Sequence, residues 1–253
     1  MDSLNNMLFG IYPYIALAIF LLGSLVRFDR EQYSWKSDSS QMLKLGQLRL
    51  GSNLFHIGIL FLFFGHAFGL LTPHWLYESL GLSTPNKQML AIVSGGIAGL
   101  ICLAGIVLLL HRRLAEPRIR ASSRPMDIII LFWILITLLL GLASIYWSLQ
   151  HREGGVMLAL GAWAQHIFTF RSGAASFIAD VPTIYKIHLF FGMTLFLLFP
   201  FSRLVHVWSG FAALGYLGRS YQVVRFRGER KPRMPQHPAA IAVSTASPPV
   251  ARR

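Results

Sequence analysis

Long apolar stretches, separated by short polar ones, run along most of the chain. A helix needs about 20 mostly apolar residues to cross the hydrocarbon layer of a membrane. Five stretches are long enough and are predicted to be membrane spans: residues 7–26, 54–71, 89–110, 127–149 and 184–208. The pattern therefore predicts an all-α membrane protein built as a bundle of five transmembrane helices.

A sixth apolar run, residues 156–170, is shorter and contains Gln165 and His166. Its length and its polar residues favour an interfacial or partly buried helix outside the membrane core over a sixth span.

The composition agrees, since 54% of the residues are hydrophobic, only 13% are charged and the mean hydropathy is +0.53. The net charge of +13 would by itself suggest a nucleic-acid partner, but its distribution excludes that interpretation. Nineteen of the 23 Lys and Arg residues lie in 27–49, 112–124 and 203–253, and the other loops hold only Lys87, Arg152, Arg171 and Lys186. Because basic residues concentrate on the cytoplasmic side, the N-terminus is expected outside and the C-terminus in the cytoplasm.

The chain begins without a basic segment or a convincing cleavage site, so the first span is expected to be retained. Residues 1–227 are predicted to form the membrane domain. Residues 228–253 are rich in Pro, Ala, Ser and charge, and this composition is typical of a disordered cytoplasmic tail. The single cysteine, Cys102, lies mid-span as a packing residue, which leaves no cysteine cluster for zinc or iron–sulfur.

Four histidines lie inside predicted spans, where ionisable residues are costly and usually functional. His56 and His66 are on the second span, and His188 and His206 are on the fifth, which runs in the opposite direction. Depth therefore pairs His66 with His188 at the outer level and His56 with His206 at the inner level. The remaining five are expected to be solvated, interfacial or packed: His74, His111, His151, His166 and His237.

Two imidazoles facing each other across a helix pair are what axial ligation of a six-coordinate haem iron requires. The spacing matches imperfectly, because ten residues span about 15 Å of helix and eighteen span about 27 Å. Tilt and a kink at Pro200 could absorb the difference. A proton relay and core histidines bonded to neighbouring helices are the alternatives. Nearby glycines would admit either a flat porphyrin or a close helix: Gly58, Gly65, Gly69 and Gly192.

Several stretches carry a resemblance to a known family: IYPYIA, SSQML, NLFHIGI, GLLTPHW, HRRL, WAQ and, most specifically, IHLFFGMTLFLLFPFSRLVHVWS. Over residues 6–225 the chain resembles the gamma subunit of membrane-bound respiratory nitrate reductase. The chain departs from that family in its extended C-terminal tail.

The resemblance implies a five-helix anchor in the bacterial cytoplasmic (inner) membrane that carries two haem b groups. It would oxidise quinol near the outer face and deliver electrons to an iron–sulfur beta subunit, while a molybdenum-containing alpha subunit reduces nitrate on the cytoplasmic side. The family's ligand pattern falls on His66 and His188 for the outer haem and on His56 and His206 for the inner haem. Its quinol region falls on Gly65, His66, Gly69 and Lys87.

With no cysteine cluster and no soluble domain, the chain is expected to relay electrons to a partner rather than complete a substrate reaction. Lys87 could donate a hydrogen bond to a quinone oxygen or serve as an interfacial anchor. Arg112, Arg113 and Arg203 could pair with haem propionates or only set the topology. The rival functions are a dihaem b subunit of another quinone-linked oxidoreductase and a haem-free transporter or assembly anchor that uses the histidines as a proton relay.

Overall fold

The structure is a computed structural model of the whole chain, and it describes residues 2–30, 45–151 and 153–208. The described residues form helices and turns and no strand. Five helices are long and apolar enough to cross a membrane: Ser3–Arg30, Leu45–Leu71, Thr84–Ala115, Pro125–Gln150 and Thr183–Phe201. The all-α prediction with five spanning helices is therefore confirmed, and the spans are longer at most ends than the apolar stretches alone indicated.

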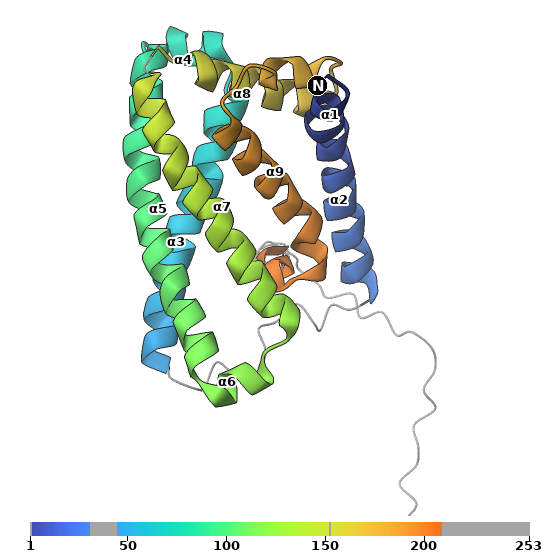
Figure 1. Cartoon of the computed structure of the whole chain (residues 1–253), viewed down its shortest axis with the longest axis vertical. Coiled ribbons are helices and arrows are strands. Elements are labelled where there is room, and N and C mark those ends of the chain that lie inside the picture. Colours follow the sequence, from blue (N-terminus) through green and yellow to red (C-terminus); the bar gives the residue numbers. More distant parts are fainter. Residues whose placement is uncertain (1, 31–44, 152, 209–253) are drawn as a thin grey trace, which may run out of the picture. The chain divides into compact units, whose positions relative to one another are not determined.

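The first span consists of α1 (Asp2–Asn6), a π-helical turn (Met7–Ile11) and α2 (Tyr12–Arg30). The next three spans are α3 (Leu45–Leu71), α5 (Thr84–Ala115) and α7 (Pro125–Gln150). Short helices join them, namely α4 (His74–Ser79) and α6 (Pro117–Ser122). In Figure 1, α4 and α6 lie at opposite ends of the bundle, as expected for consecutive spans that alternate in direction.

Small residues hold α3 and α5 together. A Cβ atom on Gly58 would lie 2.6 Å from the backbone nitrogen of Cys102, and a Cβ on Gly105 would collide with the backbone of Phe55. Helices in a membrane gain contact when small residues let their backbones approach. Gly58 therefore serves helix packing rather than an open face, and Cys102, which is fully buried, packs against it.

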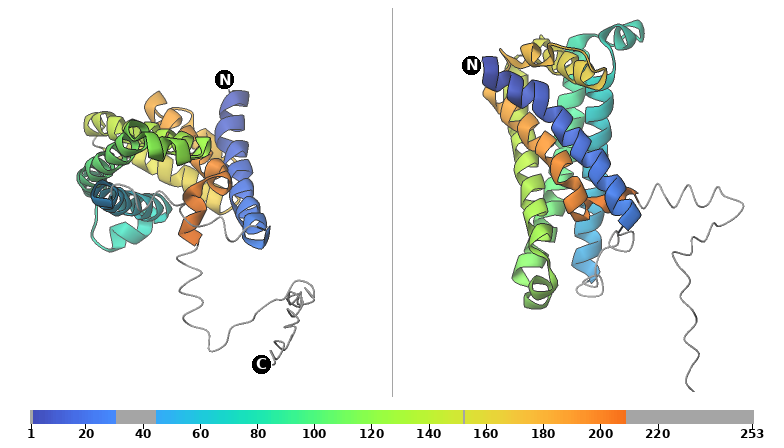
Figure 2. Two further views of the ribbon diagram at one scale, coloured as in Figure 1. Left: turned by 90° about the horizontal axis from the view of Figure 1, so that it is seen from below. Right: turned by 90° about the vertical axis from the view of Figure 1, so that its right-hand side faces the viewer.

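The sixth apolar run forms α8 (Gly155–Phe168), a helix of 14 residues. At 1.5 Å per residue it is about 21 Å long, too short for a hydrocarbon layer of about 30 Å. It lies across the same end of the bundle as α4, above the long helices (Figures 1 and 2). Its Trp163 and Ile167 pack into a cluster with Phe9, Ile178 and Tyr185, so α8 covers the ends of the first and fifth spans.

The fifth span breaks before it reaches His206. Helix α9 (Thr183–Leu198) is followed by two 3₁₀ turns, Phe199–Phe201 and Arg203–Val205. The predicted span 184–208 is therefore not regular helix throughout, and the disturbance expected at Pro200 is a break rather than a kink. Pro200 has no N–H to donate and its ring clashes with the carbonyl four residues earlier, which ends regular helix at this point.

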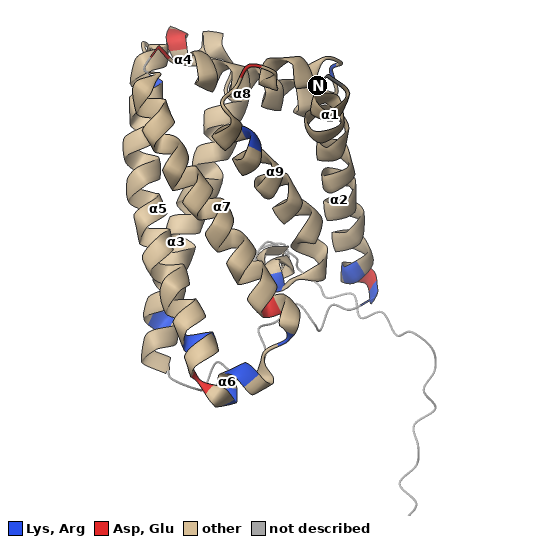
Figure 3. Cartoon of the chain, viewed as in Figure 1, with Lys and Arg blue, Asp and Glu red and all other residues tan. Residues whose placement is uncertain are grey.

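Charged residues gather mainly at the end of the bundle that carries α6, where α2 and α5 end (Figure 3). The spans between the two ends are largely uncharged, as the hydropathy predicts. The expected orientation, with this basic end in the cytoplasm, stays a prediction. The predicted boundary at residues 227 and 228, and the predicted tail beyond it, lie outside the described residues.

Candidate functional site

The four intramembrane histidines form two pairs across the space between α3 and the fifth span. The ring centres of His66 and His188 are 6.0 Å apart, and those of His56 and His206 are 5.9 Å apart. A metal–imidazole bond is about 2 Å long and the ring centre lies about 1 Å behind the nitrogen, so two imidazoles on one ion have centres roughly 6 Å apart. The structure thus brings together the two pairs that depth alone predicted, at a separation that suits one metal ion in each.

All four rings are oriented in the same way, by a hydrogen bond from Nδ1 to a backbone carbonyl. His56 and His66 donate to the carbonyls of Ser52 and Leu62 one turn earlier on α3, at 2.7 Å each. His188 donates across to Thr137 on α7 at 3.0 Å, and His206 donates to Arg203 at 2.6 Å.

A carbonyl oxygen only accepts hydrogen bonds, so these contacts assign the proton of each neutral ring to Nδ1 and the acceptor lone pair to Nε2. This is the outer-shell arrangement that fixes the tautomer and the plane of metal-bound histidines. All four imidazoles therefore share the same tautomer in this structure. No group of three or more His, Cys, Asp or Glu that could hold a metal ion occurs among the described residues.

Glycines leave room beside these rings. A Cβ on Gly141 of α7 would lie 3.0 Å from Cε1 of His188, so the ring is seated against a helix surface that has no side chain there. Gly65, Gly69 and Gly192 have no heavy atom within 4 Å of the position a Cβ would take, apart from their own local backbone. The open faces of α3 and α9 therefore have space for a flat ligand beside the pairs, and these residues fit a haem.

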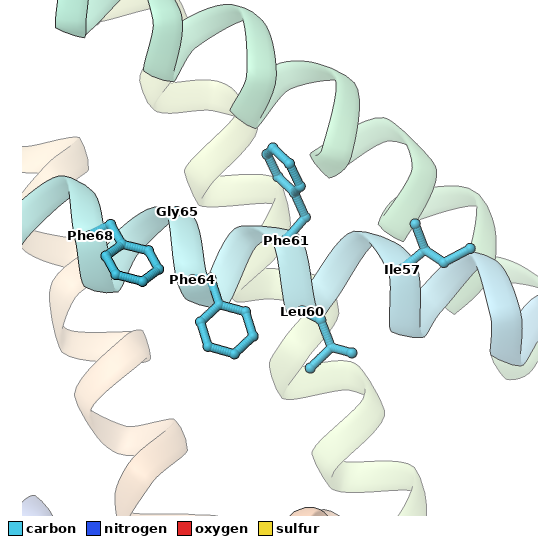
Figure 4. Close-up of a pocket in the computed structure, with 6 residues that line it drawn as sticks. All are labelled: Ile57, Leu60, Phe61, Phe64, Gly65 and Phe68. Atoms are coloured by element: carbon cyan, nitrogen blue, oxygen red, sulfur yellow. The ribbon is translucent and has the colours of Figure 1, made fainter.

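An apolar groove runs along one face of α3, and His66 is not among the residues that line it. It is lined by Ile57, Leu60, Phe61, Phe64, Gly65 and Phe68, all from this one helix (Figure 4). Gly65 leaves a gap in the row of aromatic side chains. The groove includes Gly65, and Gly69 lies one turn further on; His66, the next residue after Gly65, points about 100° further round the helix.

Lys87 lies on α5, in its first turn, at the same end as Gly69. Its Nζ atom is 3.9 Å from the ring centre of Tyr77, which comes from the connecting helix α4. The Tyr77 hydroxyl in turn is 3.2 Å from Oγ1 of Thr84. The structure thus brings Gly65, His66 and Gly69 together by their helical spacing and leaves Lys87 on the neighbouring helix, held by a cation–π contact.

Two of the three arginines proposed for haem propionates, Arg113 and Arg203, converge on one carboxylate. Asp127 of α7 accepts from Arg203 through both of its oxygens, with Nη2 at 2.6 Å from Oδ2, and its Oδ2 lies 3.2 Å from Nη1 of Arg113. Arg112 is buried with 3% of its surface exposed. The propionate role of the three arginines stays a prediction.

Sequence reasoning did not single out Asp127. The signal was available, because Asp127 is the one acidic residue in the otherwise apolar 127–149 stretch and it follows a run of arginines. A buried carboxylate requires a paired charge or several hydrogen bonds, which would have prompted a search for an arginine at the same depth.

The fold and these pairs define a class: a helical membrane protein with two bis-histidine sites, one above the other, between the second and fifth spans. Residues 5–227 match the model of the family described as nitrate reductase gamma subunit. The chain belongs to this family.

Two curated relatives come from Escherichia coli (strain K12). The chain is 52% identical to the respiratory nitrate reductase 1 gamma chain of this organism over 227 aligned residues. The alignment covers 90% of this chain and 100% of the relative. The chain is 50% identical to the respiratory nitrate reductase 2 gamma chain, with 88% and 98% covered. The nitrate reductase gamma chain of Bacillus subtilis (strain 168) is 40% identical, with 88% and 99% covered. With its five spanning helices, the chain is a multi-pass membrane subunit of the respiratory nitrate reductase type.

Proposed function

We propose that the chain is the membrane-anchoring cytochrome b subunit of a respiratory nitrate reductase, which oxidises quinol near the periplasmic face and delivers the electrons inward. The observation that carries this proposal is the pair of facing imidazole sites, in which every Nδ1 is held by a carbonyl. Family membership adds the reaction that such a subunit serves.

The chain's own residues would hold one cofactor at each level. His66 and His188 supply two Nε2 ligands at the outer level, and His56 with His206 supplies two at the inner level. When bound there, two haem b groups provide one-electron carriers between quinol and a cytoplasmic iron–sulfur subunit. The ten residues from His56 to His66 separate the two ligands on α3 by about 15 Å of helix rise, a distance suited to electron transfer between levels.

Quinol would bind at the outer end, where Gly65 opens the groove on α3 at the level of His66. Gly65 and Gly69 admit a flat ring because neither has a side chain, and Lys87 supplies the cationic hydrogen-bond donor for a quinol oxygen. Lys87 would exchange its contact with Tyr77 for this bond, at the cost of a cation–π interaction. Quinol loses two electrons and two protons as it becomes quinone, and a site at this end releases the protons outside.

The partners in this proposal are an iron–sulfur beta subunit and a molybdenum-containing alpha subunit on the cytoplasmic side, with nitrate reduction in the alpha subunit. The proposal is supported by the names of the relatives, each of which is the gamma chain of a nitrate reductase. The corresponding location is the cytoplasmic (inner) membrane of a bacterium.

The decisive experiment is a haem analysis of the purified chain in detergent. Acid–acetone extraction should release protohaem, since the chain has no C-x-x-C-H sequence for covalent attachment, at two haems per chain. A reduced-minus-oxidised spectrum should show b-type bands. A haem content near one would refute the two-level arrangement, and an absence of b-type bands would favour the rival proton relay.

A further inference from the structure

His206 differs from the other three histidines in the backbone that carries it. His56 and His66 lie within α3 and His188 lies within α9, so regular helix fixes their positions. His206 follows the break at Pro200 and two short 3₁₀ turns. Such turns have few internal hydrogen bonds, and their position depends on what the surrounding structure contributes.

One contribution comes from the first span. Arg27 of α2 donates from Nη1 to the carbonyls of Pro200 at 2.7 Å and Ser202 at 2.8 Å. These carbonyls lie where the helix has stopped and regular helical donors are missing. Arg27 therefore holds the chain immediately after the break.

A second contribution comes from α7 and acts one residue further along. The carboxylate of Asp127, which is 4% exposed, receives Nε and Nη2 of Arg203 in a two-pronged contact. The backbone nitrogen of Arg124 also donates to Oδ2, at 3.1 Å. Asp127 is thus fixed on a rigid helix and in turn fixes the direction of the guanidinium group.

Arg203 connects this carboxylate to the histidine, because its own carbonyl accepts the hydrogen bond from Nδ1 of His206 at 2.6 Å. Asp127 thus holds the side chain of Arg203, and the backbone carbonyl of Arg203 holds the imidazole of His206. Leu204 and Val205 between them are packed, and Val205 is fully buried.

We propose that Asp127 is a positioning residue for His206: through its two-pronged contact with Arg203 it sets the 3₁₀ turn whose carbonyl orients the imidazole of the inner pair. This inference rests on the proposed function for the identity of the cofactor at that pair. It assigns Arg203 to the support of the inner ligand rather than to a haem propionate.

Asp127→Asn in the intact subunit complex tests the proposal, because the amide keeps the size of the side chain and loses the charge-assisted contact. The readout is the electron paramagnetic resonance spectrum of the oxidised low-spin haems, whose g values depend on the relative orientation of the two axial imidazoles. The signal of the inner haem should shift or broaden, and the signal of the outer haem in the same sample should stay unchanged. An unchanged inner signal would overturn the proposal, and so would an equal change in both.

Arg203→Lys provides a second variant that keeps the charge and removes the planar fork. It should reproduce the shift of the inner signal, which separates orientation from electrostatics. Arg203→Lys also tests the proposal by itself if the Asp127→Asn protein fails to accumulate. An inner haem signal like that of the wild type in Arg203→Lys would then refute the proposal. Asp180→Asn and Arg120→Gln, which change exposed charges elsewhere, are the matched controls and should leave both signals unaltered.

The unmodified complex separates this proposal from the function on which it rests. If it lacks two b-type signals, the proposed function fails. If both signals are present and neither variant moves the inner one, only the role of Asp127 fails.

Discussion

At the scale of single residues, the common feature of the candidate ligands is the carbonyl that each Nδ1 meets. Sequence reasoning could place His56, His66, His188 and His206 at two depths by counting residues along helices. It could not assign their tautomers, because the acceptor of His188 is Thr137, fifty-one positions away on another span. The same limit applies to Gly141, whose missing side chain matters only because α7 passes beside His188.

Gly141→Ala tests the seat of the outer ligand. The added methyl group would lie 3.0 Å from Cε1 of His188, tighter than ordinary van der Waals contact, so the ring or the helix must shift. The bands of the outer haem should shift or weaken, and the haem content should fall from two towards one per chain. Gly95→Ala is the matched control, since a Cβ there meets nothing within 4 Å and should leave the spectrum unchanged. Equal spectra for both variants would contradict the close seating of His188.

Lys87→Ala tests the proposed donor to quinol. Lys87 is no ligand, so both haem spectra should stay intact and dithionite should reduce both haems fully. Loss of one charge-assisted hydrogen bond costs roughly 1.5–3 kcal/mol, so the rate of haem reduction by quinol should fall about ten- to a hundredfold. Stopped-flow spectroscopy measures that rate. Lys186→Ala, which removes another cation in the first turn of a span, should keep the parent rate. A parent rate in Lys87→Ala would make Lys87 an interfacial anchor held on Tyr77.

At the scale of elements, the five spans were predictable because hydropathy is a local property of each stretch. The end of α9 was less predictable from the sequence. Pro200 signals a disturbance in the sequence, but whether the chain kinks or stops depends on contacts from distant parts of the chain. Arg27 of α2 donates hydrogen bonds to the carbonyls of Pro200 and Ser202, and Asp127 of α7 accepts hydrogen bonds from Arg203. The Arg27 contacts supply donors to carbonyls where regular helix has ended, and the chain still brings His206 opposite His56.

The break also explains how unequal spacings can match. Ten residues separate the two histidines of α3, whereas eighteen separate His188 from His206. If the fifth span were a continuous helix, its two histidines would be about 27 Å apart, whereas the two histidines of α3 are about 15 Å apart. Because the chain leaves the helix after Leu198, the remaining residues before His206 do not all advance along the helix axis. The ring centres of both pairs are therefore about equally close.

The two levels should respond separately to ligand replacement, because each haem takes one ligand from α3 and one from the fifth span. His66→Ala and His188→Ala should each remove the outer haem and block reduction by quinol. His56→Ala and His206→Ala should each remove the inner haem, leaving an outer haem that quinol reduces but that cannot pass electrons on. Optical redox titration of membranes distinguishes the two haems. Loss of the same haem in the His56 and His188 variants would show that the ligands are paired across levels.

At the scale of the whole molecule, the two ends of the bundle carry different chemistry. The end that carries α6 has most of the described charges (Figure 3). Lys87 and α8 belong to the other end, and the groove lies in the half of α3 nearer to it. Nineteen of the 23 Lys and Arg residues fall in segments assigned to one side, which is why the sequence predicts the orientation. Nothing in the geometry of the bundle itself depends on which end faces the cytoplasm, so this prediction needs its own experiment.

Reporter fusions and proton release test that orientation together. A fluorescent protein fused after Arg253 should fold and fluoresce in the cytoplasm, and an alkaline phosphatase fused there should be inactive. With the groove end outside, quinol oxidation by the complex in right-side-out vesicles should acidify the medium as electrons move inward to nitrate. Moving each electron inward against the resting membrane potential costs about 2.3 kcal/mol per 100 mV, so collapsing the potential with valinomycin and K⁺ should speed the inner haem's reduction. A C-terminal fusion active only outside, or acid release only into the vesicle lumen, would reverse the assigned orientation and move the quinol site to the cytoplasmic face.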